Sequence, residues 1–97
     1  MPRRRNTVLA IADSARTIKS HDGSLSFVLR RKARGVQLER KENVDEDSVN
    51  GYVSLVTVFE TVQQLQDFSE ADDARYRYPL VFQQLRREAD ELFGLAP

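Results

Sequence analysis

Three consecutive residues, Ser20, His21 and Asp22, are of the types that form the catalytic triad of many hydrolases. A triad needs side chains that converge within hydrogen-bond reach, whereas consecutive side chains on any regular backbone point in different directions. His21 is the only histidine of the chain. Its polar, turn-rich surroundings indicate a solvated turn residue, so we expect no histidine-based acid–base catalysis.

A second group with possible chemistry is the acidic segment 43–51, NVDEDSVNG, which resembles the start of a calcium loop. Counted from Asp45, an EF-hand loop needs an oxygen ligand at its fifth position, glycine at its sixth and glutamate at its twelfth. These three positions hold Val49, Asn50 and Val56. The sequence therefore predicts an acidic loop without a metal site.

Other catalytic arrangements are also missing from the sequence. The chain has no cysteine, which rules out a thiolate zinc site, a cysteine nucleophile and a disulfide framework. No glycine-rich phosphate loop occurs, and the adjacent Asp72 and Asp73 suit a turn or a helix start. We expect a protein that is not an enzyme and that takes no cofactor or small-molecule substrate.

Positive and negative charges are unevenly distributed along the chain. The net charge is zero, but residues 1–41 hold eleven Arg and Lys against three acids (+8), and residues 42–97 hold four Arg against twelve acids (−8). Such asymmetry is typical either of a face that binds a polyanion or of two halves that neutralise each other on folding. The densest basic stretch is residues 30–41, RRKARGVQLERK.

A further cluster combines arginine with aromatic residues. Residues 74–82 read ARYRYPLVF, in which Arg75 and Arg77 alternate with Tyr76 and Tyr78. Such alternation can stack single-stranded bases, and the same residue types are enriched in protein interfaces. Burial of Tyr78 and Phe82 in or beside the core is the simpler explanation.

Length and composition indicate one soluble globular domain. The chain has 97 residues, of which 40% are apolar and 31% charged. The apolar run after the basic N-terminus, Val8–Ala12, is shorter than the ~7 to 15 residues of a signal-peptide core. No segment approaches the ~20 apolar residues of a membrane span, and we expect a cytoplasmic protein.

The N-terminal part allows two interpretations. Residues 1–6 are expected to form a flexible basic arm. In the first interpretation a helix follows within residues 7–21 and ends at Gly23; in the second, residues 16–21 form a strand that enters a hairpin at Asp22-Gly23, with Ile18 opposite Phe27. The helix is favoured by the spacing of its apolar positions, which are Val8, Ile11, Ala12, Ala15 and Ile18.

The next segment has the alternation of a half-buried hairpin. Residues 24–31 and the segment after Gly35 place apolar side chains at every second position. A four-residue loop over residues 31–34 would pair Leu29 with Val36 and Phe27 with Leu38. Arg31, Lys32 and Arg34 would then form a cationic tip.

Residues 52–59, YVSLVTVF, are the strongest strand in the sequence. Both faces of this strand are apolar, with Val53, Leu55 and Phe59 on one face and Tyr52, Val56 and Val58 on the other. This pattern predicts a central strand that is covered on both sides, or a strand whose second face meets a partner chain.

Two helices are expected after this strand. Thr61 and Gln64 form a capping-box pattern, and Val62, Leu65 and Phe68 follow it with helical spacing. A last helix is expected over residues 79–93, with Pro79 in its first turn and Gly94 at its end. Its apolar stripe consists of Phe82, Leu85, Ala89, Leu92 and Phe93.

These elements predict an α+β domain over residues 7–94, with residues 95–97 as a C-terminal tail. Its small antiparallel sheet has three or four strands, and the N-terminal helix and two C-terminal helices pack on one face of the sheet.

Two functions follow as hypotheses, both non-catalytic. The first is nucleic-acid binding through the basic N-terminal half and the hairpin tip, by Arg3, Arg4, Arg5, Arg30, Arg31, Lys32 and Arg34. The alternative is a protein-interaction or homo-oligomerisation domain without a nucleic-acid role. Its interface would contain Tyr52, Val56, Val58, Arg75, Tyr76 and Arg77.

Overall fold

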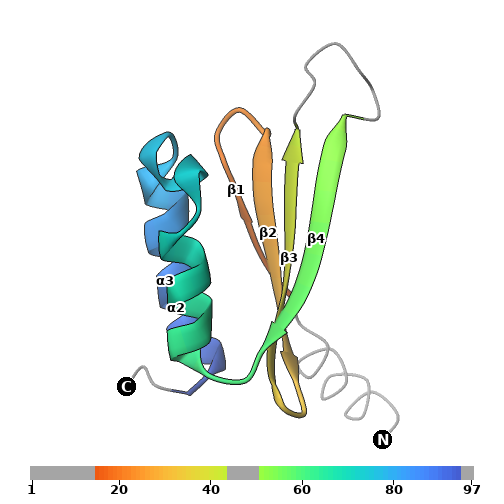
Figure 1. The fold of residues 1–97 in the computed structure, drawn as a ribbon, viewed down its shortest axis with the longest axis vertical. Coiled ribbons are helices and arrows are strands. Elements are labelled where there is room, and N and C mark those ends of the chain that lie inside the picture. The colour runs from red at the N-terminus through yellow and green to blue at the C-terminus, as the bar shows by residue number, and fades with distance from the viewer. Residues whose placement is uncertain (1–14, 44–50, 95–97) are drawn as a thin grey trace, which may run out of the picture.

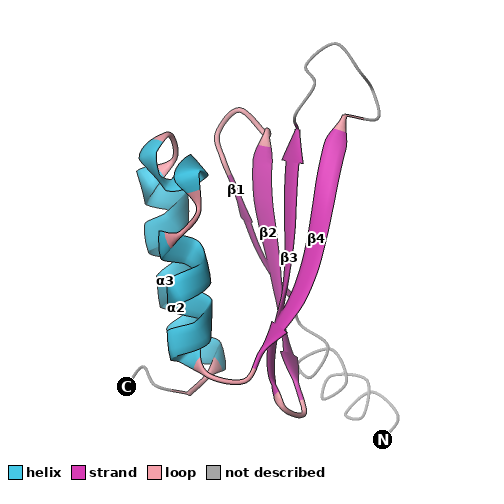
Figure 2. Ribbon diagram, viewed as in Figure 1, coloured by secondary structure: helices cyan, strands magenta, loops and turns pink. Residues whose placement is uncertain are grey.

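A computed structural model describes residues 15–43 and 51–94 as a four-stranded antiparallel sheet followed by helices. The strands β1 (Ala15–Lys19), β2 (Leu25–Lys32), β3 (Gly35–Asn43) and β4 (Tyr52–Phe59) lie side by side in chain order. The helix α2 (Val62–Glu70), the 3-10 turn η1 (Asp73–Tyr76) and the helix α3 (Pro79–Leu92) complete the described chain. Figures 1 and 2 show both helices on one side of the sheet, which confirms the α+β class and the C-terminal helical layer.

The helix expected over residues 7–21 is wrong where the structure describes that segment. Residues 15–19 form β1, and Ile18 lies opposite Phe27 on β2, as the hairpin interpretation predicts. Gly23 adopts a φ of +76° in the turn, a conformation that glycine enters without strain. Pairing with β2 outweighs the helical spacing of the apolar residues, of which Val8, Ile11 and Ala12 lie outside the described residues.

The expected register of the second hairpin is also wrong. Leu29 pairs with Leu38 rather than Val36, and Phe27 pairs with Arg40. The strands continue to Lys32 and Gly35, which leaves a two-residue turn in place of the four-residue loop. The shift is two residues, so each side chain keeps its expected face, and Arg40 lies opposite Phe27, beside the core.

The segment 52–59 is an edge strand and not a central one. Because the strand order is β1-β2-β3-β4, β4 has a hydrogen-bonded neighbour only on its β3 side within the described chain. Its apolar side chains are about half exposed on both faces: Tyr52 52%, Val53 53%, Leu55 45%, Val56 54% and Val58 50%. Only Phe59, at its end, joins the core.

The core lies between the sheet and the two C-terminal helices. Phe27 of β2 meets Phe82 of α3 edge to face, with ring centroids 5.3 Å apart. Leu65 of α2 and Leu85 of α3 are completely buried. These residues lie on the apolar stripes expected for the two helices. No helix in the described residues is long and apolar enough to cross a membrane.

The start of α2 confirms the predicted capping box. The amide of Gln64 donates to the hydroxyl of Thr61 over 3.2 Å, and the side-chain oxygen of Gln64 accepts from the amide of Thr61 over 3.3 Å. The helix therefore begins where the sequence pattern places it, directly after β4.

Gly35 generates a prediction about stability. Its φ is +153°, and a Cβ added there would overlap the carbonyl oxygen of Phe59 on β4. Gly35→Ala is therefore expected to lower the free energy of unfolding by about 2 to 4 kcal/mol, through backbone strain and a displaced strand. The matched control is Gly23→Ala, where φ is +76° and an added Cβ has open space. We expect it to cost only about 1 kcal/mol, and denaturant unfolding that shows equal losses would contradict this role of Gly35.

Candidate functional site

The sheet sorts the basic residues of the first half onto its two faces. Side chains alternate along each strand, and the face opposite the helices is the open face. In its cross-strand rows Lys19, Ser26, Lys41 and Ser54 follow one another, and Arg30 lies beside Gln37. Among the described residues, the open face carries four exposed cations, Lys19, Arg30, Lys32 and Lys41, against one acid, Glu39.

The acidic residues of the segment from α2 to α3 lie on the other side of the sheet. The segment from α2 to α3 carries seven carboxylates against four arginines, a balance of −3. It neutralises part of the basic half directly. Arg16 on β1 contacts Glu88 and Glu91 of α3 at 2.5 and 2.7 Å, and Arg31 on β2 donates to the carbonyl oxygen of Leu92.

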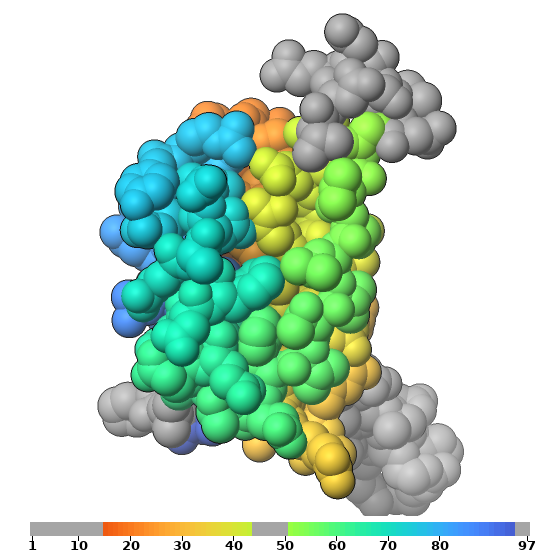
Figure 3. Space-filling model, in the orientation of Figure 1, coloured from red at the N-terminus to blue at the C-terminus, as the bar shows by residue number. Residues whose placement is uncertain are grey.

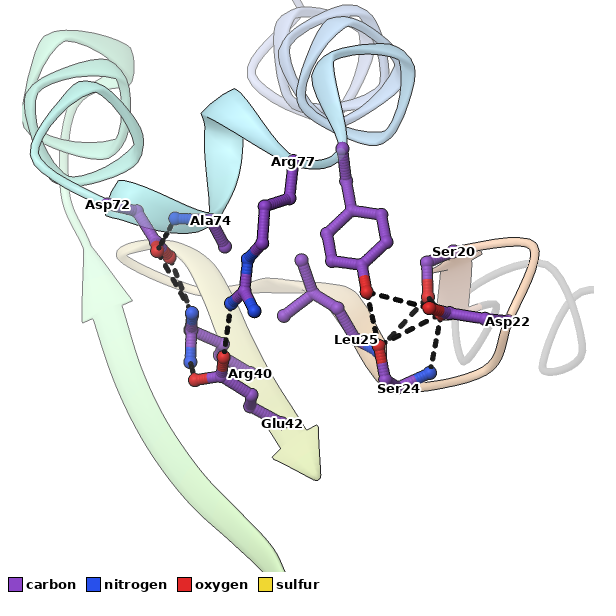
Figure 4. Close-up of polar contacts among 10 residues, drawn as sticks. Ser20, Asp22, Ser24, Leu25, Arg40, Glu42, Asp72, Ala74 and Arg77 are labelled. Atoms are coloured by element: carbon purple, nitrogen blue, oxygen red, sulfur yellow. Dashed lines mark hydrogen bonds and ion pairs between the residues drawn. The ribbon is translucent and has the colours of Figure 1, made fainter. Parts of the chain in front are cut away.

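The strongest of these contacts joins Arg40 of β3 to Asp72, the residue that caps η1. Arg40 Nε and Nη2 donate to the two carboxylate oxygens of Asp72 over 2.6 and 2.9 Å, a bidentate geometry (Figure 4). Glu42 accepts from Arg40 and from Arg77, each over 3.0 Å. Burial alone would lower the pKa of Arg40, but the hydrogen bonds that Arg40 donates to Asp72 and Glu42 outweigh it and raise this pKa.

The open face contains a shallow hollow of about 600 Å³. Lys19 and Lys41 line it from β1 and β3, the hydroxyls of Ser26 and Ser54 lie between and beside them, and Tyr52 closes one end. The Tyr52 hydroxyl is 3.4 Å from the carbonyl oxygen of Gly23, so its ring extends from β4 toward the β1–β2 turn. This hollow offers ammonium groups, hydroxyls and one aromatic ring.

Glu39 is the one acid that the described strands place on this face, and its contacts with cations are long. Its carboxylate lies 3.8 Å from the ammonium of Lys41 and accepts from Ser54 over 3.3 Å. Exposed ion pairs at such distances contribute little to stability. The cationic character of the open face therefore persists around it.

The residues Ser20, His21 and Asp22 do not form a triad. Ser20 Oγ donates directly to Asp22 Oδ1 over 2.7 Å, and the His21 ring packs edge-on to Tyr78 at 6.3 Å between centroids. Tyr78, at the start of α3, donates to the other carboxylate oxygen of Asp22 over 2.7 Å (Figure 4). The cluster fastens the β1–β2 turn to the beginning of α3, which is a structural role.

The seven residues predicted to bind nucleic acid are divided by the structure. Arg30 and Lys32 lie on the open face and Arg34 in the β2–β3 turn, whereas Arg31 faces the helices. Arg3, Arg4 and Arg5 lie outside the described residues. Sequence reasoning missed Lys19 and Lys41, although the alternation of β1 and β3, once β1 is taken as a strand, is enough to place both on the open face.

The predicted interface residues belong to two separate surfaces. Tyr52, Val56 and Val58 lie together on the open face of β4. Arg75, Tyr76 and Arg77 lie in and directly after η1, on the helical side, where Arg75 stacks on the Tyr76 ring at 4.2 Å and Arg77 contacts Glu42. The six residues therefore do not form one continuous interface on a single copy of the chain.

Within residues 15–43 and 51–94, no three His, Asp or Glu residues gather closely enough to hold an ion. The acidic residues 44–50 of the segment considered for calcium lie outside those ranges.

The Arg40–Asp72 contact predicts a large effect of one substitution. Asp72→Ala removes both bonds to Arg40 and the cap on the amide of Ala74, and it leaves the half-buried Arg40 guanidinium without its main acceptor. We expect a loss of about 2 to 4 kcal/mol in the free energy of unfolding. Asp73→Ala, at the exposed neighbouring carboxylate, is the control and is expected to change it by about 0.5 kcal/mol or less. Chemical denaturation measures both.

The Asp22 cluster predicts a dependence on pH. Hydrogen bonds from the Ser20 hydroxyl, the Ser24 amide and the Tyr78 hydroxyl hold the pKa of Asp22 well below its usual range. Because this pKa is lower than the unfolded value of about 3.9, the stabilisation is complete above about pH 4 and is lost as the pH falls toward the folded value.

Thermal unfolding followed by circular dichroism tests this dependence. Asp22→Asn should lower the melting temperature at about pH 7 but have a much smaller effect at about pH 2. Glu70→Gln, at an exposed residue at the end of α2, is the matched control. An Asp22→Asn effect that is the same at both pH values would contradict the assigned role of the charge.

No model of a known protein family matches the chain, and no curated protein or solved structure gives a significant match. The open face remains the described surface where exposed cations gather away from the acidic helices.

Proposed function

We propose that this protein is a non-catalytic module that binds single-stranded nucleic acid on the open face of its sheet. The observation that carries the proposal is the separation of charge by the sheet. Lys19, Arg30, Lys32 and Lys41 extend from one face, and the carboxylates of α2 to α3 lie behind the other. A polyanion that approaches the open face meets these cations on the side of the sheet away from the carboxylates of α2 to α3, and among the described residues only Glu39 lies between them.

The spacing of these cations suits a chain of phosphates. Lys19 and Lys41 lie in one row on strands separated by β2, so their backbones are about 10 Å apart. Arg30 and Lys32 lie further along β2, at about 13 and 20 Å from that row. The cations therefore mark out a track along the strands, long enough for several nucleotides of an extended strand.

Geometry favours a single strand over a duplex. The major groove is about 12 Å wide and admits a helix or a two-stranded ribbon, whereas four strands at about 4.8 Å spacing form a broader surface. The β2–β3 hairpin, expected from the sequence to form a cationic tip, extends only a few residues beyond its neighbours. One of its cations, Arg31, is directed to α3.

The open face also offers groups for bases and sugars. Tyr52 is 52% exposed at the end of the hollow and can stack a base. Val56 and Val58, each about half exposed, provide apolar contacts beside the cationic track. Cations for phosphates and an aromatic ring for bases are the combination that sequence-tolerant single-strand binders use.

Fluorescence anisotropy with a random single-stranded oligonucleotide tests the proposal across salt concentrations. Four phosphate contacts predict a slope of log K against log salt of about −3 for a single strand. Lys19→Gln combined with Lys41→Gln should reduce the slope to about −1.5, with folding unchanged because both side chains are exposed. A duplex probe of the same length should bind more weakly.

The control removes the same charge from the other side of the molecule. Arg86 and Arg87 are exposed on α3, and Arg86→Gln with Arg87→Gln should leave the slope and the affinity nearly unchanged. No binding at low salt would refute the proposal. Equal weakening by the control pair would place the binding elsewhere.

A further inference from the structure

The outer edge of β4 lacks the features that usually prevent an edge strand from pairing with another sheet, and this observation is independent of nucleic-acid binding. This edge strand has eight residues, none of them charged and none proline. Edge strands usually carry charges, prolines or bulges that prevent pairing with another sheet. The opposite edge, β1, has five residues and includes Arg16 and Lys19. β1 is therefore protected against pairing, and β4 is not.

The exposed apolar side chains on both faces of β4 also indicate that this strand is open to pairing with another strand. Val53 and Leu55 are about half exposed on the helical face, and Tyr52, Val56 and Val58 on the open face. Figure 3 shows β4 at the surface along its length, beside α2 and β3. A partner that covers only one face would leave the other face solvated, whereas a strand added to the edge shields both.

We propose that two copies of this chain form a symmetric dimer by antiparallel pairing of their β4 strands. The partner must offer a free, uncharged β-edge, and a second copy presents this same edge. Antiparallel pairing of a strand with itself is generated by a two-fold axis perpendicular to the sheet, so the contact is isologous and closes at two subunits. The product is one continuous eight-stranded sheet.

Side-chain alternation restricts the pairing register. Residues that lie opposite each other must be on the same face of the sheet. The two-fold axis therefore lies between the two copies of Leu55 or between the two copies of Val56, and a register that pairs Leu55 with Val56 is not allowed. In the first register Leu55 meets its own copy and Tyr52 meets Val58; in the second Val56 meets its own copy and Leu55 meets Thr57. Both registers place apolar side chains opposite each other on both faces.

The helical side has room for the partner strand's side chains. A hollow of about 250 Å³ lies between β4 and α2 and is lined by Leu55, Phe68 and Ala71, with Arg40 and Asp72 at its polar end. In either register a residue of the partner's β4 lies beside Leu55 at the mouth of this hollow. The symmetry also keeps all helices on one side, so the two open faces join into one surface.

Sedimentation equilibrium of the full chain tests the dimer. The wild type should dimerise with increasing concentration, and Val56→Lys should shift it to monomer because two ammonium groups would meet at the axis or beside it. Thr17→Lys is the matched control, since Thr17 occupies the same cross-strand row at the β1 edge. It should leave the dimer intact, and circular dichroism reports whether each variant folds.

Cysteine cross-linking provides a test that keeps the apolar edge. The chain has no cysteine, so a single introduced thiol can bridge only to another copy. Opposite residues of an antiparallel pair have Cα atoms about 4.5 to 5.5 Å apart, within the range for a disulfide. Either Leu55→Cys or Val56→Cys should therefore form a disulfide dimer rapidly under mild oxidation, and Thr17→Cys should not. A wild type that stays monomeric at all concentrations, or cross-linking that is as fast at position 17, would overturn the proposal.

Discussion

The structure depends on one constraint: in the residues that it describes, a single layer of helices covers one face of a four-stranded sheet and leaves the other open. Because side chains alternate along each strand, this layer decides the environment of every second residue. Ile18, Phe27, Leu29 and Leu38 lie beneath the helices and are buried. Lys19, Arg30 and Lys41 occupy alternate positions of the same strands and are directed to solvent on the other face, which separates these charges from the helical layer without any dedicated element.

Polar contacts then fix the position of the helical layer and select which cations are neutralised. Arg40 and Asp72 join β3 to η1, and Asp22 and Tyr78 join the β1–β2 turn to the start of α3. Arg16 joins β1 to the second half of α3. The cations Arg16 and Arg40 on the helical face thus hold the helical layer in place, whereas those on the open face are exposed to solvent.

Local sequence rules predicted the C-terminal half well and the N-terminal half less well. The capping box at Thr61, the proline at the start of α3 and the apolar stripes are local signals, and the structure confirms them. The secondary structure of β1 was harder to predict because the spacing of its apolar residues also fits a helix. Only the pairing of Ile18 with Phe27, a tertiary contact, selects the strand. The position of β4 at the edge was not predictable from its composition, since apolar residues on both faces are typical of central strands.

The candidate site shows the same division between local and tertiary information. The basic character of residues 30–41 is visible in the sequence, but its separation into Arg30 and Lys32 on one face and Arg31 and Arg40 on the other needs the strand assignment and the position of the helices. Lys19 and Lys41 enter the site only when β1 and β3 are aligned through β2. A basic run in the sequence therefore shows how much charge is present and not which face displays it.

The central claim is that the open face, and not the helical side, meets the polyanion. An amide chemical-shift titration of the labelled protein with a short single-stranded oligonucleotide tests it most directly. The account predicts shifts along the cationic track, at Lys19, Ser26, Arg30, Lys41 and Tyr52, with α2 and α3 nearly unchanged. Shifts concentrated around Arg75, Arg86 and Arg87, or none at low salt, would contradict it.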